Sequence, residues 1–130
     1  MTRLAVLLVA AVLLAACGSD DEVERPPAAP GATDLTAVVH PEGPDGPVRR
    51  ERLRCPGDSR CDRLDAKAFE PTPQDVACTE IYGGPATARV TGRLEGRRID
   101  ARFSRNNGCE IARWDALEWL LGRAPGPSAP

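Results

Sequence analysis

The segment from Cys78 to Pro85 (CTEIYGGP) gathers residue types that suit a binding task better than a catalytic one. A cysteine can fix one end of the segment covalently, and the glycines and proline at the other end cannot continue a regular element. Glu80 is the charged residue between those ends. We therefore predict a short loop that is pinned at one end and offers an acidic side chain to a partner.

Groups for acid–base or nucleophilic catalysis are not paired in this sequence. His40 is the only histidine, and it stands directly before the turn-forming residues 41–47. It has no second imidazole or paired nucleophile to work with, and no pair of carboxylates can be assembled from the rest of the chain. We therefore expect His40 at the surface, and we expect neither an enzyme nor a cofactor.

Cys55 and Cys61 enclose five residues, among them a proline and a glycine that favour a turn. A disulfide here would close a small loop and contribute about 2.4 kcal/mol on the chain-entropy model. Zinc is the competing interpretation, because pairs of cysteines bind it. The gap is wider than the usual spacing of about two to four residues and no second close pair follows, so we expect no metal.

Composition points to an exported domain. The 130 residues include five cysteines and thirteen prolines but only five aromatic residues, which favours a loop-rich domain stapled by disulfides in an oxidising compartment. The length allows one modest domain. The formal net charge is -2 and acids and bases are mixed along the chain, so nothing indicates nucleic-acid binding.

The chain begins in the manner of an exported protein. Met1 to Arg3 form a short basic start, and the apolar run from Leu4 to Ala16 is too short to span a membrane. The sequence Leu14-Ala15-Ala16-Cys17 resembles the lipobox of bacterial lipoproteins, whose cysteine is lipidated and becomes the mature N-terminus. The alternative is an ordinary signal peptide that is cleaved before Cys17 and leaves it as a free thiol.

These features divide the chain into four parts. Residues 1–16 are the predicted lipoprotein signal peptide, and residues 17–33 are the lipidated Cys17 with a flexible tether. Residues 34–123 form the domain, and residues 124–130 a disordered tail. We expect an exported protein that contacts the membrane through its lipid anchor only, on the outer face of the cell membrane, or that is extracellular if released.

The loop has to be positioned by the elements on both sides of it. Residues 35–39 alternate as a half-buried strand does, and residues 48–55 are a less clearly patterned second strand. Residues 62–69 are a candidate short helix. Its buried side would consist of Leu64, Ala68 and Phe69. Two prolines then force an irregular approach to Cys78.

The best-patterned element is a hairpin between Pro85 and Arg105. A two-residue turn at Glu95-Gly96 places all apolar partners on one face. The predicted apolar pairs are Gly92 with Ile99, Val90 with Ala101, and Ala88 with Phe103. The same register opposes two arginine pairs on the outer face, Arg93 with Arg98 and Arg89 with Arg102, where like charges repel. We interpret this face either as solvated or as a surface that meets an acidic partner.

A final helix is predicted after the turn at Asn106-Asn107-Gly108, because apolar residues then recur at helical spacing until Gly122. These residues are Ile111, Trp114, Leu117 and Leu121. Trp119 falls away from this stripe, so it is either an exposed anchor for self-association or packs at the edge against a neighbouring loop.

The order of these features resembles the subtilisin-inhibitor-like (SSI) family of secreted bacterial proteinase inhibitors. Cysteine order, loop signature and hairpin spacing agree between Leu35 and Trp114. The resembling features are Leu53-Arg54-Cys55-Pro56, Cys61-Asp62-Arg63-Leu64, a Cys78-x-x-x-Tyr82 loop, the Gly92 to Phe103 hairpin, and Asn107 with Cys109. The resemblance implies the disulfides Cys55–Cys61 and Cys78–Cys109. It also implies an α+β fold, an antiparallel sheet of about five strands packed with two short helices, and a homodimer.

The resemblance further implies a serine proteinase inhibitor. Such inhibitors present an exposed, extended loop as a substrate would, and hold it so rigidly that cleavage is slow and religation easy. Carried over by position, the side chain of Glu80 enters the primary specificity pocket and Glu80-Ile81 is the reactive bond. The proteinase-binding residues would be Cys78, Thr79, Glu80, Ile81 and Tyr82, with Asn107 as a hydrogen-bonding support.

The loop departs from the family pattern in three places. Known subtilisin and trypsin inhibitors carry an apolar or basic residue at the position of Glu80 and proline at that of Thr79, and Gly83-Gly84 replaces a stiffer exit. A carboxylate suits a basic pocket, as in a glutamate-specific serine endopeptidase, whereas the resemblance implies a subtilisin-like one. We expect one of these two as partner. The alternative is a non-inhibitory envelope lipoprotein that uses the inhibitor scaffold as a protein-binding module, through the arginines of the hairpin.

Overall fold

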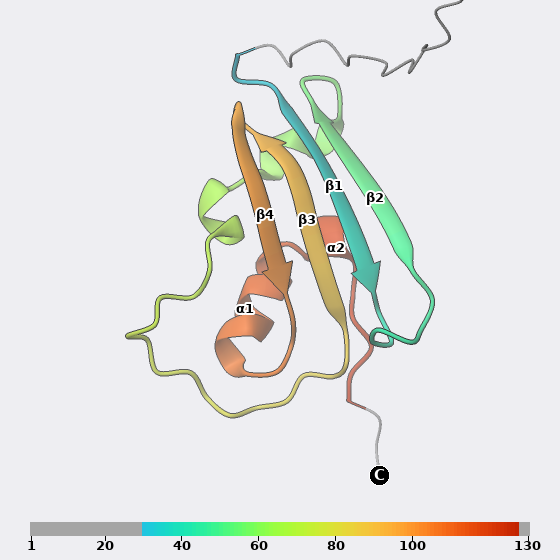
Figure 1. The fold of residues 1–130 in the computed structure, drawn as a ribbon, viewed down its shortest axis with the longest axis vertical. Helices are drawn as coiled ribbons and strands as arrows, with labels where there is room; N and C mark the ends of the chain where they lie inside the picture. Colours follow the sequence, from blue (N-terminus) through green and yellow to red (C-terminus); the bar gives the residue numbers. More distant parts are fainter. Residues whose placement is uncertain (1–29, 128–130) are drawn as a thin grey trace, which may run out of the picture.

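The structure is a computed structural model that describes residues 30–127. Four strands form one antiparallel sheet in the order β2-β1-β3-β4 (Figure 1). They are β1 (Thr33–His40), β2 (Arg49–Cys55), β3 (Thr87–Leu94) and β4 (Arg97–Phe103). The predicted α+β fold is confirmed, with four strands in the described residues where about five were expected. The predicted signal peptide, Cys17, most of the tether and the end of the tail lie outside these residues.

Strand β1 lies between β2 and β3 and alternates buried with half-buried residues along its whole length. Leu35, Ala37 and Val39 are at most 1 % exposed. Because successive side chains of a strand point to opposite faces, these three define the face of the sheet that carries the core. The strand predicted at residues 35–39 is therefore confirmed.

Strands β3 and β4 pair in the predicted register, from Ala88 opposite Phe103 to Arg93 opposite Arg98. The chain reverses at Glu95-Gly96, where φ is 49° and 82°. A two-residue turn that matches the twist of the strands needs such left-handed residues, and glycine adopts them without strain. The predicted hairpin is thus confirmed down to its turn.

Two short 3-10 helices, η1 (Ser59–Arg63) and η2 (Ala66–Phe69), replace the single helix predicted at residues 62–69. Asp58 and Asp65 each accept a hydrogen bond from the backbone N–H two residues ahead. The chain therefore starts a helix twice, and the extended Leu64 separates them. The prediction of one helix was wrong for this reason, although Phe69 is buried as predicted.

The C-terminal helix is divided as well, into α1 (Gly108–Ala116) and α2 (Glu118–Leu121), with Leu117 between them. The predicted core residues Trp114, Leu117 and Leu121 are at most 1 % exposed. After the break, Trp119 is partly buried against the core. It therefore packs at the edge of the domain and is not an exposed anchor.

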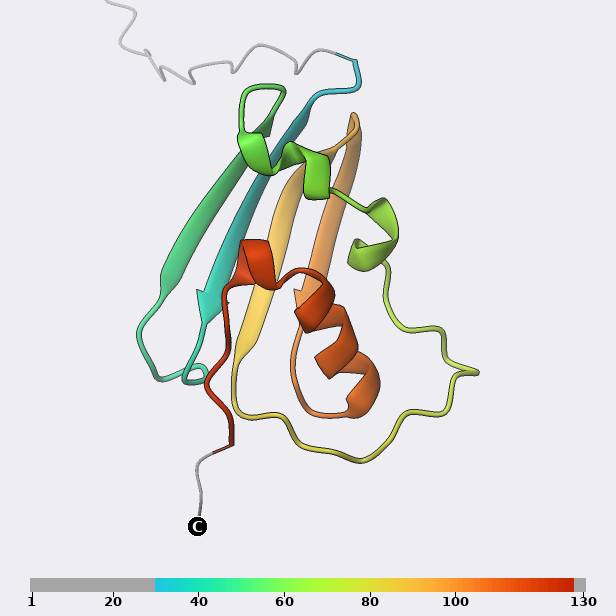
Figure 2. The ribbon, with the colours of Figure 1, turned by 180° about the vertical axis from the view of Figure 1, so that it is seen from behind.

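The helices cover one face of the sheet, and the other face is open. Figure 2 shows the helices in front of the sheet, whereas Figure 1 shows the strands from their uncovered side. None of the helices within residues 30–127 is long and apolar enough to cross a membrane. The domain is therefore two layers, with its core between sheet and helices.

Candidate functional site

The segment between η2 and β3 runs without regular structure around the edge of the helix layer. Figures 1 and 2 show it passing beside α1 at the end of the molecule opposite the start of β1. Residues 78–84 form its lower part, and we call them the presented loop. The start of β1 and the presented loop therefore lie at opposite ends of the domain.

The first fixed point of the presented loop is its start. Cys78 and Cys109 form a disulfide with their Cα atoms 5.4 Å apart, which ties the loop to the first turn of α1. Next to it, the backbone N–H of Gly108 donates a hydrogen bond of 2.9 Å to the carbonyl of Thr79. Cys55 and Cys61 form the other disulfide, so both implied pairings are confirmed.

Gly108 approaches Thr79 more closely than a side chain would allow. A Cβ at residue 108 would overlap the Oγ1 atom of Thr79 and lie 3.4 Å from its Cβ. Thr79 is β-branched and stiff at χ1, so it would have to change rotamer to make room for that Cβ. Glycine at residue 108 therefore permits the close packing of the loop on the helix.

The second fixed point is at the end of the presented loop. The N–H of Gly83 donates to the carbonyl of Arg105 at 2.7 Å, and the Nε of Arg105 donates back to the carbonyl of Gly83 at 3.1 Å. The guanidinium itself is held by an ion pair of 2.8 Å with Asp115 and lies 5.9 Å from the ring centroid of Trp114. Arg105 therefore acts as a strut between the loop and α1.

Gly83 and Gly84 are both buried, so this exit from the loop is packed. A Cβ on Gly83 would lie 2.8 Å from the Cδ1 of Ile111, and one on Gly84 would lie 2.8 Å from the carbonyl oxygen of Pro125. Gly84 also has φ of 110°, a conformation that other residues adopt only with strain. The two glycines thus permit close contact with the helix and the C-terminal segment.

The residues between the two fixed points are open to solvent. Ile81 is 60 % exposed and Tyr82 56 %, and Thr79 and Glu80 are exposed as well. Tyr82 therefore does not anchor the core. Within residues 30–127 no ion pair engages the carboxylate of Glu80. The Glu80-Ile81 peptide and its two side chains are therefore accessible from solvent.

Asn107, the predicted hydrogen-bonding support of the loop, lies at the start of α1. Its side-chain oxygen accepts the backbone N–H of Glu110 at 2.9 Å and caps α1. Glu110 in turn accepts the hydroxyl of Thr72 at 3.0 Å, on the incoming arm of the loop, and pairs with Arg113 at 2.8 Å. Among the described residues, the side chain of Asn107 therefore bonds to α1 and not to the loop itself.

Sequence reasoning missed four of the residues that hold the loop. They are Thr72, Arg105, Gly108 and Glu110. One of them had a local signal, because Asn107-x-x-Glu110 has the spacing of a helix capping box. The other three depend on contacts between segments that only the fold brings together.

Metal-binding groups do not gather at this site or elsewhere in the described part of the chain. No group of three or more histidine, cysteine, aspartate or glutamate side chains there is placed to hold a metal ion. His40 ends β1 and is half-buried, on the open face of the sheet rather than at the loop.

Comparisons with protein-family models, with curated proteins and with solved structures found no match for this chain. The candidate site is one exposed peptide segment whose two ends are fixed to the same helix layer. A segment held in this way can enter a cleft that binds extended peptides, and it loses little conformational freedom when it does so.

Proposed function

We propose that the chain is a serine proteinase inhibitor of the subtilisin-inhibitor-like family, with Glu80-Ile81 as its reactive bond. The observation that carries the proposal is the exposure of Glu80, Ile81 and Tyr82 between two fixed points. An endopeptidase binds its substrate as an extended segment. A loop that already has its ends fixed pays little ordering entropy on binding, so it binds more tightly than a free peptide of the same sequence.

The same two fixed points account for slow net cleavage. If the proteinase cuts after Glu80, the new carboxyl end stays attached through the disulfide of Cys78 and the hydrogen bond to Thr79. The new amine on Ile81 stays attached through Gly83 and Arg105. Both ends stay in place while Glu80 is held as an ester on the proteinase's serine. The amine of Ile81 can therefore attack that ester, re-form the peptide bond and release the serine hydroxyl.

The charge of Glu80 sets the proposed specificity. A carboxylate in the primary pocket favours a proteinase whose pocket is basic, and disfavours one with an acid at its base. We therefore propose a glutamate-specific serine endopeptidase as the first target and a subtilisin-like one as the second. The lipid anchor at Cys17 would not obstruct the encounter, because β1 begins at the end of the molecule opposite the loop (Figure 1).

The test is a titration of the mature chain against glutamate-specific and subtilisin-type endopeptidases. We expect stoichiometric inhibition of at least one, and its loss in Glu80→Ala. Glu42→Ala is the matched control, because Glu42 is an exposed glutamate in a turn outside residues 78–84. Inertness toward every proteinase tried would instead favour a non-inhibitory binding module.

A further inference from the structure

The open face of the sheet carries a regular array of arginines. Its outward-pointing residues form three rows across the four strands. In the strand order β2-β1-β3-β4 the rows are Arg54-Asp34-Arg93-Arg98, Arg52-Thr36-Thr91-Asp100 and Arg50-Val38-Arg89-Arg102. Seven arginines, all exposed, stand against two aspartates, which leaves a net charge of +5. We call this surface the arginine face.

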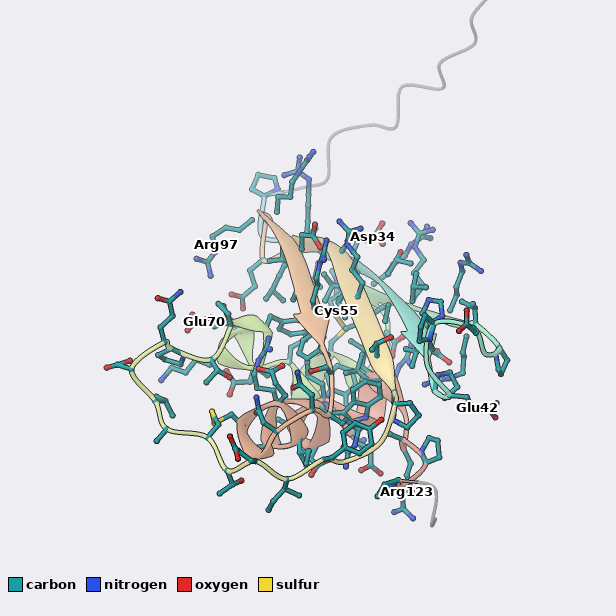
Figure 3. The ribbon with its side chains drawn as sticks, turned by 60° about the horizontal axis from the view of Figure 1, so that its bottom comes forward. Asp34, Glu42, Cys55, Glu70, Arg97 and Arg123 are labelled. Atoms are coloured by element: carbon teal, nitrogen blue, oxygen red, sulfur yellow. A yellow bond between two sulfur atoms is a disulfide. The ribbon has the colours of Figure 1, made fainter. Side chains whose placement is uncertain are left out.

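The acids of the arginine face are already held by arginines of the same face. Arg52 binds Asp34 through two hydrogen bonds of 3.0 and 2.8 Å, and Arg89 binds Asp100 through two of 2.8 and 2.5 Å. Figure 3 shows Asp34 among nitrogen-bearing side chains on the side of the sheet away from the helices. Asp34 and Asp100 are the only acids in the three rows, so within the described residues the charge of this face stays positive.

The arginine face also breaks a rule of sheet stability. Arg93 stands directly opposite Arg98, and Arg89 opposite Arg102, and like charges opposed across a sheet are destabilising. Sequences break such local rules where function requires it. The sequence retains these arginines although they repel one another, and this indicates an anionic partner.

The side chains of the arginine face suit a negatively charged lipid surface better than a protein as the partner. Aromatic anchors are common at the centres of protein interfaces, and none stands in the three rows, where Val38 is the one apolar side chain. A second copy of this chain would oppose arginines with arginines. Guanidinium groups pair well with phosphate, and clusters of basic residues close to a membrane bind anionic lipids.

We propose that the arginine face docks on the anionic phospholipid headgroups of the membrane to which Cys17 anchors the chain. Thr33 lies only 16 positions after Cys17, so even a fully extended chain of that length keeps the start of β1 within about 55 Å of the anchor. The helices and the presented loop lie on the side of the sheet away from this face (Figures 2 and 3). A docked domain therefore keeps Glu80 accessible. The inference does not depend on whether the loop inhibits a proteinase.

The experiment measures binding of the mature chain, with Cys17→Ser so that no acyl chain contributes, to lipid vesicles. Vesicles of phosphatidylcholine alone are compared with vesicles that also contain phosphatidylglycerol, at about 0.1 M and about 1 M salt. We expect binding only with phosphatidylglycerol at low salt. The triple variant Arg50→Gln, Arg98→Gln, Arg102→Gln should bind roughly a hundred-fold more weakly, since each charge near the surface contributes roughly a factor of five.

The matched control is Arg63→Gln, Arg97→Gln, Arg123→Gln, which removes the same charge from exposed residues outside the arginine face. It should bind like the parent chain, and both variants should keep the parent's circular dichroism. Equal weakening by the two variants, or no binding to phosphatidylglycerol, would overturn the proposal. So would a dimer in sedimentation that the first variant alone dissociates, because the face would then belong to a second copy.

Discussion

Single residues hold the presented loop through close approach. Gly108 and Gly83 contact Thr79 and Ile111 at distances that leave no room for a Cβ. Arg105 fills the remaining space with a side chain that makes hydrogen bonds, an ion pair and a ring contact at once. Rigidity at this site therefore comes from packing and from a few directed hydrogen bonds.

Gly108→Ala should weaken inhibition while leaving the domain folded. The added methyl group displaces Thr79, next to the proposed reactive bond, whereas alanine is itself a good helix former. We expect the inhibition constant to rise roughly ten-fold or more, which corresponds to about 1.4 kcal/mol. Adding Thr79→Ala should recover part of the loss, because the clashing atoms are then absent.

Gly126→Ala is the control for this substitution. A Cβ at residue 126 has no atom within 4 Å, so its addition should change neither inhibition nor stability. An inhibition constant that is unchanged in Gly108→Ala would mean that the loop conformation does not depend on this contact.

At the scale of elements, the two disulfides have different tasks. Cys55–Cys61 joins residues six apart and closes the turn between β2 and η1. Cys78–Cys109 joins residues 31 apart and links the presented loop to α1. The second bridge therefore reduces the conformational entropy of the unfolded chain. It also limits how far the ends of a cut loop can separate.

Replacing each pair by serines should separate these tasks. Loss of Cys78–Cys109 should lower the free energy of unfolding by about 3.7 kcal/mol and turn the proposed inhibitor into a substrate that is cut after Glu80. Loss of Cys55–Cys61 should lower it by about 2.4 kcal/mol and leave inhibition intact. Denaturant midpoints and mass spectrometry of the digested chain measure the two effects. Equal loss of inhibition in both variants would contradict this division.

The cap of η1 predicts a dependence of stability on acid. Hydrogen bonds from the side chain and the backbone N–H of Arg60 lower the pKa of Asp58 from 3.8 to about 2. Because the pKa is lower in the folded chain than in the unfolded one, the stability it contributes is present above about pH 4 and is lost as the pH falls toward about 2. In Asp58→Asn the denaturant midpoint should therefore decrease less between these pH values than in the parent chain. In Asp45→Asn, in an exposed turn, it should decrease as much as in the parent chain.

For the whole molecule, local patterns were predictable and distant contacts were not. The β3–β4 register follows from alternation and one turn, and the structure has it pair by pair. The sequence did not predict that the helices are interrupted at Leu64 and Leu117. The first interruption was missed because the aspartate caps start a new helix within a stretch whose apolar spacing suggested a single one. Arg105 bonds to a residue 22 positions away, so neither local sequence indicates the contact.

The arginine face shows the same limit. The arginines of β3 and β4 were visible as opposed pairs in the hairpin register. Those of β2 join them only because β1 lies between β2 and β3, and alternation does not determine a strand order. The surface that results is larger than the hairpin, and the repulsion between its arginines acts across the whole sheet.

Arg98→Thr should therefore make the domain more stable and the proposed membrane contact weaker. Removing one of two opposed charges relieves repulsion from Arg93, and we expect a gain of about 0.5 kcal/mol in the free energy of unfolding. Binding to phosphatidylglycerol vesicles should fall roughly five-fold. Arg97→Thr is the control, because it makes the same change of side chain opposite Leu94 instead of an arginine. A gain in stability as large in the control would show that threonine's preference for strands, and not charge, is responsible, and the arginines would then carry no penalty that a function has to explain.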